Sequence, residues 1–169
     1  MALKQLPEDF KDFLNFLNTN GVKYLLIGGW AVGIYGYPRA TGDMDVLIAT
    51  DEANLDKLLK ALYEFGAPSI AKDHFKEKGN VFRMGRSPIK IDVINEASGI
   101  DIEDCYSRRN VVHIDGIDIS LISREDLLRN KKASGRTKDI ADVESLENLV
   151  NGTRKRTRRK PGQNNGRVV

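Results

Sequence analysis

The sequence has few of the residues that build disulfide frameworks or histidine metal centres. Its 169 residues include a single cysteine, Cys105, and two histidines, His74 and His113. One cysteine cannot form an intramolecular disulfide or a cysteine-rich zinc site, so a reducing cytoplasm is the expected compartment. We therefore expect neither a disulfide-stapled domain nor a histidine-based metal site.

Long apolar runs are also missing from the sequence. No stretch approaches the roughly 20 apolar residues that a membrane helix needs. Residues 1–7 lack the basic segment and apolar run of a secretory signal. We expect a soluble, cytoplasmic protein with no membrane partner, and the length suits one domain, because domains commonly contain about 100–200 residues.

Acidic residues are absent from residues 153–169, which carry seven of the 27 Lys and Arg residues. The remaining 20 basic and 24 acidic residues give residues 1–152 a formal charge of −4, against +3 for the whole chain. We predict a folded domain over 1–152 and a basic, disordered tail over 153–169, whose composition cannot bury a core. The tail could bind nucleic acid through its charge, but no aromatic residue is interleaved to stack on bases, and a solvated terminus is the simpler interpretation.

What the sequence does contain is an alternation of helical and strand patterns. Helices are expected where apolar residues recur with helical spacing, over 7–21, 55–66, 123–132 and 137–150, with a short helix over 30–37. Strands are expected over 22–27, 44–49, 80–84, 89–94, 111–114 and 117–121. Turn residues at 85–88 and 115–116 join the last four strands into two hairpins. The mixture predicts an α/β fold with a mixed β-sheet flanked by helices.

A glycine pair, Gly28 and Gly29, lies between the first predicted strand and the short helix. Without side chains, backbone N–H groups and the positive end of a helix can approach an anion such as a triphosphate. Taken alone this is weak evidence, since paired glycines after a strand often form only a tight turn.

Two carboxylates, Asp43 and Asp45, lead into the strand that follows. With a strand period of two, both project from one face while Met44 and Val46 occupy the other. Two like charges held this close repel, so the arrangement indicates a neutralising cation. Oxygen ligands alone favour Mg²⁺ or Mn²⁺. The alternative is an acidic loop that merely enters a strand.

A third carboxylate, Asp92, interrupts the otherwise apolar strand over 89–94. If that strand lies beside 44–49 in the sheet, Asp92 joins Asp43 and Asp45 in a cluster able to hold two metal ions about 4 Å apart. Such a cluster suits phosphoryl chemistry, with Asp92 as metal ligand and proton acceptor for an attacking hydroxyl. A salt bridge between Asp92 and a lysine such as Lys90 is the alternative.

Gly28, Gly29, Asp43, Asp45 and Asp92 together resemble the signature of the polymerase-beta-like nucleotidyltransferase superfamily. That signature is a glycine pair, a short helix, an Asp-x-Asp on a strand and a third acidic residue on a later strand. The resemblance covers about residues 10–150 and implies the fold of that superfamily. It also implies a Mg²⁺-dependent enzyme that transfers a nucleoside monophosphate from an NTP, such as ATP, to a hydroxyl acceptor and releases pyrophosphate.

Arg39 and Thr41, which precede the aspartate pair, resemble the branch that contains bacterial toxin-type and antibiotic-modifying nucleotidyltransferases. The toxin type includes abortive-infection and type IV toxin–antitoxin proteins. This resemblance implies nucleotide binding by Arg39 and Thr41, an antitoxin partner, and an acceptor that is RNA such as tRNA, protein or a small molecule. The antibiotic-modifying enzymes are expected to carry an added helical domain, for which this chain has only the helices after Ser123.

The segment 127–149 resembles a second pattern of the toxin-type branch. Its matching residues are Lys131, Arg136, Lys138, Asp139 and Asp142. Such a basic cluster at a helix junction could neutralise a triphosphate, with the two aspartates orienting the basic side chains. This predicts Lys131 and Arg136 as nucleotide ligands, although a solvated helix face explains the pattern nearly as well.

Three functions are compatible with these motifs, and the nucleotidyltransferase is favoured. A catalytically silent nucleotide- or nucleic-acid-binding module of the same fold is the second, and the intact set of three aspartates argues against it. A metal-dependent phosphatase or nuclease is the third, and it leaves the glycine pair without a purpose.

Overall fold

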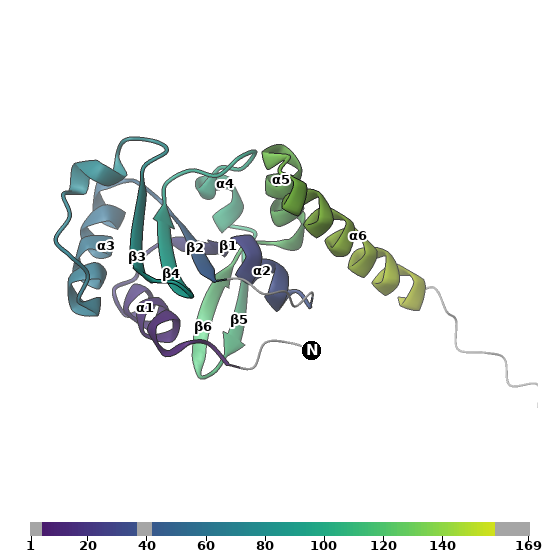
Figure 1. Ribbon diagram of the computed structural model, residues 1–169, viewed down its shortest axis with the longest axis horizontal. Helices are drawn as coiled ribbons and strands as arrows, with labels where there is room; N and C mark the ends of the chain where they lie inside the picture. Colours follow the sequence, from purple (N-terminus) through teal and green to yellow (C-terminus); the bar gives the residue numbers. More distant parts are fainter. Residues whose placement is uncertain (1–4, 37–41, 158–169) are drawn as a thin grey trace, which may run out of the picture.

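The computed structural model describes residues 5–36 and 42–157, and within them a six-stranded mixed sheet forms the centre of the molecule (Figure 1). The strands lie in the order β3-β4-β2-β1-β6-β5. Their bounds are β1 Tyr24–Ile27, β2 Asp43–Ile48, β3 Val81–Arg86, β4 Ile89–Ile94, β5 Asn110–Ile114 and β6 Ile117–Leu121. β2 runs parallel to β4 and β1 parallel to β6, whereas β1 and β2 and the two hairpins are antiparallel. The predicted α/β fold with a mixed sheet and two hairpins is confirmed.

Helices cover both faces of this sheet (Figure 1). Their bounds are α1 Glu8–Thr19, α2 Gly28–Ile34, α3 Glu52–Phe65, α4 Ile102–Tyr106, α5 Arg124–Ser134 and α6 Thr137–Thr157, with a 3₁₀ turn, η1, at Lys72–Phe75. The predicted start of α5 at Ser123 is confirmed, because the Ser123 hydroxyl caps the helix by accepting a hydrogen bond from the Asp126 N–H at 3.1 Å. The sequence missed α4 and η1, which are too short to show a helical period. It also placed the start of α2 two residues late, at Trp30 instead of Gly28.

The last helix differs from the prediction in its length. α6 continues to Thr157 instead of ending at Val150, so the predicted boundary between 152 and 153 falls inside a helix. The added residues include Gly152, a poor helix former that favours an earlier end, and the good helix formers Arg154, Lys155 and Arg156. Figure 1 shows the end of α6 leading away from the sheet. Residues 158–169, most of the predicted tail, lie outside the described residues.

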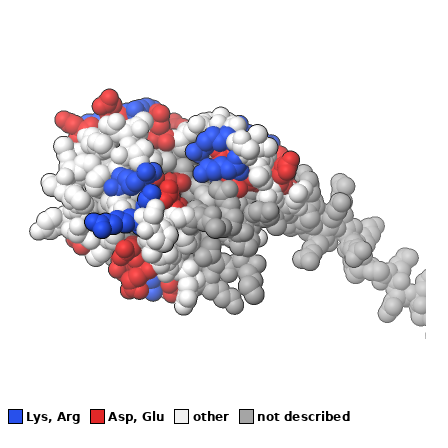
Figure 2. All heavy atoms as spheres, in the orientation of Figure 1, with Lys and Arg blue, Asp and Glu red and all other residues white. Residues whose placement is uncertain are grey.

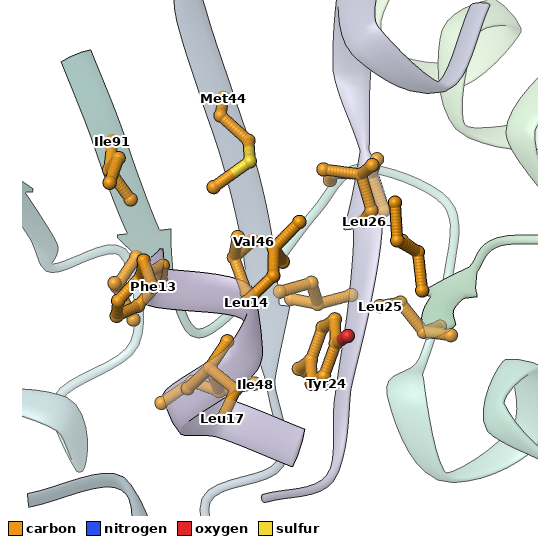
Figure 3. Packing of buried hydrophobic residues seen from close by; sticks show 14 of the residues in the cluster. Phe13, Leu14, Leu17, Tyr24, Leu25, Leu26, Met44, Val46, Ile48 and Ile91 are labelled. Atoms are coloured by element: carbon orange, nitrogen blue, oxygen red, sulfur yellow. The ribbon is translucent and has the colours of Figure 1, made fainter. Parts of the chain in front are cut away.

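The core lies between the sheet and the pair α1 and α3. Figure 3 shows Phe13 and Leu14 of α1 turned toward Met44 and Val46 of β2, and all four side chains are buried. Because side chains alternate along a strand, this places Asp43 and Asp45 on the opposite face of β2. In residues 5–36 and 42–157, none of the helices combines the length and the apolar character of a membrane span.

Candidate active site

The three predicted aspartates lie on two neighbouring strands of the sheet. Asp45 on β2 and Asp92 on β4 are direct partners in the parallel register. Asp43 lies two residues before Asp45 and therefore on the same face of the sheet. All three line one cavity of about 620 Å³. The structure thus brings the three carboxylates together, whereas their roles as metal ligands stay predictions.

Ionisation of the Asp45 carboxyl group is unfavourable in this structure. Burial, followed by repulsion from Asp92 and Asp43, raises its pKa from 3.8 to about 6. Lys131 and Lys138 offset part of this increase. A cation bound beside Asp45 would relieve the same repulsion, which is the electrostatic condition that a divalent metal ion meets.

Gly28 is required by its proximity to Asp45. Its φ is +72°, a conformation that side chains rarely adopt, and a Cβ atom at this position would collide with the Asp45 carboxylate. Both Gly28 and Gly29 line the cavity. The structure therefore shows that a glycine at position 28 makes room for Asp45. Phosphate binding by the two backbone N–H groups is a proposal.

Asp92 makes an ion pair that the sequence did not predict. Arg83 on β3 donates from Nε to Oδ1 at 2.8 Å and from Nη2 to Oδ2 at 2.9 Å. These hydrogen bonds raise the pKa of the Arg83 guanidinium. The alternative weighed for Asp92, a salt bridge, is thus present, but its partner is Arg83 and not Lys90. Arg83 lies directly opposite Asp92 in the β3–β4 register, whereas Lys90 is a neighbour along the same strand.

The donor set suits Mg²⁺ or Mn²⁺, since it consists of carboxylate oxygens and includes one carboxyl group with a raised pKa. Its present arrangement is less suited. Across residues 5–36 and 42–157, no three His, Cys, Asp or Glu side chains are grouped so that they could hold a metal ion. Both oxygens of Asp92 accept hydrogen bonds from Arg83 instead.

The opposite wall of the cavity comes from the junction of α5 and α6. Lys131 Nζ lies 2.9 Å from Asp139 Oδ1 and 3.1 Å from Asp142 Oδ2, and all three side chains are buried. Arg136 Nε lies 2.8 Å from Asp139 Oδ2, and the Ser134 hydroxyl donates to the same oxygen. The prediction that these aspartates orient the basic side chains is confirmed for Lys131 and Arg136.

Asp139 is held as an anion by these neighbours. Burial raises its pKa, but hydrogen bonds from Ser134, Lys131 and Arg136 outweigh that effect and bring the pKa to about 2. Lys131 is therefore a buried member of an ion cluster, with little surface left for a ligand. Arg136 and Lys138 are exposed and line the cavity, so the accessible positive charge of this wall is theirs.

Acidic and basic side chains alternate across the mouth of the site. Figure 2 shows acidic side chains between two groups of basic ones, one over β3 and β4 and the other over α5 and α6. The cavity is also lined by Glu96, Ser98 and Asn130, which the sequence did not indicate because isolated polar residues in loops and on helices form no motif. Arg39 and Thr41, the other predicted nucleotide ligands, lie outside the described residues.

This sheet, with its paired aspartates and the glycine turn beside them, is the fold of polymerase-beta-like nucleotidyltransferases. Solved structures with the same fold include the lincosamide antibiotic adenylyltransferase LnuA with bound lincomycin. That structure has a TM-score of 0.58 and 16% identity, and the match covers 87% of this chain and 99% of LnuA. The antibiotic-resistance factor ANT(2'')-Ia has a TM-score of 0.54 and 15% identity, covering 88% of this chain and 91% of that one.

The chain belongs to the family described as nucleotidyltransferase of unknown function (DUF6036), whose profile matches residues 1–153. No curated protein matches the sequence. The chain spans nearly the full length of LnuA and ANT(2'')-Ia. Neither protein therefore has a large segment outside the part that matches this chain.

Proposed function

We propose that this nucleotidyltransferase uses Mg²⁺ or Mn²⁺ to transfer a nucleoside monophosphate from an NTP to a hydroxyl group, with release of pyrophosphate. The observation that carries the proposal is the register of β2 and β4, which sets Asp45 beside Asp92 in a cavity that Asp43 also lines. Basic side chains of α5 and α6 line the other wall. Phosphoryl transfer requires carboxylates that bind cations and basic side chains that bind phosphates.

Each of these residues has a proposed role in the reaction. When bound to Asp43, Asp45 and Asp92, divalent ions would neutralise charge on the triphosphate and on the leaving pyrophosphate. The acceptor oxygen forms a bond to the α-phosphorus while the bond to pyrophosphate breaks, and Asp92 receives the hydroxyl proton. Asp43 and Asp45 lie beside Asp92 on the same face, so ions held by the three carboxylates would draw the reacting phosphate to this part of the sheet.

The phosphates are oriented by groups on the rim of the cavity. The proposed contacts are the backbone N–H groups of Gly28 and Gly29 and the exposed side chains of Arg136 and Lys138. Lys131 supports this wall from inside through Asp139 and Asp142. Arg39 and Thr41 are further proposed ligands, on the resemblance alone.

The acceptor is a hydroxyl group on RNA such as tRNA, on protein or on a small molecule. The LnuA structure holds lincomycin, and ANT(2'')-Ia has been solved in complex with adenylyl-2''-tobramycin, but identities of 16% and 15% support a common fold and no common acceptor. The toxin-type pattern favours a role as a toxin, which modifies a cellular target and is restrained by an antitoxin.

Transfer from α-³²P-labelled NTPs tests the proposal. The protein is incubated with Mg²⁺, Mn²⁺ or EDTA and with separate pools of tRNA, cell protein and hydroxylated small molecules. We expect a labelled acceptor and pyrophosphate with either ion, loss of both products in Asp45→Asn, and no loss in Asp118→Asn, which alters an exposed carboxylate on β6. Binding of NTP without turnover would favour the silent module, and orthophosphate in place of pyrophosphate would favour a phosphatase.

A further inference from the structure

Arg83 occupies a position that conflicts with the proposed use of Asp92. Its two hydrogen bonds engage both oxygens of that carboxylate, at 2.8 and 2.9 Å. The Asp92 side chain is only 9% exposed, so few directions of approach to its oxygens are left. While this ion pair is intact, Asp92 cannot present either oxygen fully to a metal ion.

We infer that Arg83 is a displaceable counterion, which holds Asp92 in the metal-free protein and moves onto the phosphates of the nucleotide when divalent ions take Asp92. The inference rests on the proposed function, and it adds Arg83 to the residues that bind the nucleotide. It also explains why the three aspartates converge although no metal-holding group is formed among the described residues.

The pair is placed so that it can open without a change of fold. Arg83 lies on β3, an edge strand of the sheet, and its side chain is 56% exposed. Its guanidinium can rotate about side-chain bonds while the backbone pairing with β4 stays in place. Because the arginine is more than half exposed, solvent screens this ion pair, and it is weak compared with direct coordination of a carboxylate to a divalent ion.

The released guanidinium has an obvious new partner. Arg83 lines the same cavity as the aspartates and the glycine pair, where the triphosphate is proposed to lie. The planar guanidinium donates two parallel hydrogen bonds to phosphate oxygens as readily as to a carboxylate. The Arg83 guanidinium thus has an anionic partner in both states, which is Asp92 before the nucleotide binds and the triphosphate afterwards.

Binding of Mn²⁺ alone gives a test that requires no turnover. Calorimetric titrations of the full chain compare Arg83→Gln with wild type, with Arg83→Lys and with Arg86→Gln. Arg86 is an exposed arginine on the same strand that side-chain alternation places on the opposite face. We expect Arg83→Gln to bind Mn²⁺ about fivefold more tightly, on the scale of one partly exposed ion pair. Arg83→Lys, which keeps the charge and loses the two-point contact, falls between, and Arg86→Gln stays within about twofold of wild type.

Binding of the Mn²⁺ complexes of α,β-methylene NTP analogues should change in the opposite direction. Arg83→Gln loses the proposed phosphate contact, so its affinity for the best-bound analogue falls by about fivefold. An Arg83→Gln variant that binds Mn²⁺ no more tightly than wild type, or an equal gain in Arg86→Gln, overturns the counterion role. Unchanged analogue affinity overturns the move onto the phosphates.

Should Arg83→Gln fail to fold, as judged by circular dichroism, Arg83→Lys carries the same comparison with a smaller expected change. The inference and the proposed function fail separately. Transfer activity without any Mn²⁺ effect removes only the counterion role. If Arg83→Gln binds Mn²⁺ more tightly and the NTP analogue more weakly, but the protein never transfers a nucleotide, only the proposed reaction is refuted.

Discussion

Replacing Asp45 by asparagine should stabilise the metal-free protein at neutral pH, although it removes a central residue of the site. The folded structure raises the pKa of Asp45 from 3.8 to about 6 through burial and through the charges of Asp92 and Asp43. At about 1.4 kcal/mol per pKa unit, ionised Asp45 lowers the free energy of unfolding by about 3 kcal/mol. Asparagine keeps the size of the side chain and cannot ionise, so it recovers this amount.

The sign of the effect gives it a characteristic pH dependence. Because the carboxyl group ionises first in the unfolded chain, the free energy of unfolding of the wild type falls as pH rises from about 4 to about 6. Below pH 4 both states are protonated and the difference between the two proteins disappears.

Urea unfolding in EDTA between pH 3.5 and 8 measures this difference directly. Asp118→Asn serves as the control, since it removes an exposed carboxylate on β6 and should follow the wild type. We expect the advantage of Asp45→Asn to grow to about 3 kcal/mol above pH 6.5. An Asp45→Asn protein that is less stable than wild type at pH 7.5, or a difference that does not vary with pH, would refute the reasoning.

Three further predictions concern the other wall and the C-terminus. Asp139→Asn should lower the free energy of unfolding, whereas Asp45→Asn raises it, because the pKa of Asp139 is lowered to about 2. The variant loses about 2 kcal/mol of stability above pH 4, and urea unfolding should show this loss vanishing as pH falls toward 2. Lys131→Met should destabilise the protein by about 3–5 kcal/mol, since it removes the buried cation that lies between Asp139 and Asp142. Lys138→Gln should leave the melting temperature unchanged and weaken NTP binding in a fluorescence titration. The reverse pattern would make Lys131 the ligand and Lys138 structural. Deleting residues 153–169 removes the last residues of α6, so the helical circular dichroism signal should fall only slightly and NTP affinity should be preserved. Weaker binding of tRNA with a flatter salt dependence would identify the tail as an acceptor contact, and identical salt slopes would make it a passive terminus.

Side-chain alternation was enough to predict the acidic half of the site. In this strand Asp43 and Asp45 alternate with the apolar Met44 and Val46. Only one orientation of the strand buries both apolar side chains, and it turns the two aspartates to the other face. The same reasoning applies to Asp92, which is flanked by the buried Ile91 and Val93. From the sequence, it had to be assumed that the two strands are neighbours in the sheet, and the pairing of β2 with β4 confirms this.

The partner of Asp92 could not be found in this way, because it depends on the length of a turn. A turn over residues 85–88, as the sequence suggested, would set Val81 across from Asp92. In the structure β3 continues to Arg86 and β4 begins at Ile89, so Arg83 is the residue opposite. Both registers expose the same faces, and apolar patterning therefore does not distinguish them. Similarly, the pattern around Lys131 identified the right residues, but only packing of α6 on α5 shows that Lys131 is buried.

The charges of the metal-free site indicate where a first ion would bind. Asp92 is paired with Arg83, and Asp139 with Lys131 and Arg136, whereas Asp45 keeps a raised pKa in the midst of these pairs. The Asp45 carboxylate is destabilised by burial and by the charges of Asp92 and Asp43, which together cost about 3 kcal/mol. A cation bound at Asp45 would offset both effects, so part of this cost would contribute to its binding free energy. Below pH 6 the same ion must first displace a proton from Asp45, so its affinity should fall as the solution is acidified. Instability of the empty site and affinity of the loaded one thus have a single cause, and any substitution that relieves the repulsion around Asp45 should weaken metal binding as it stabilises the fold.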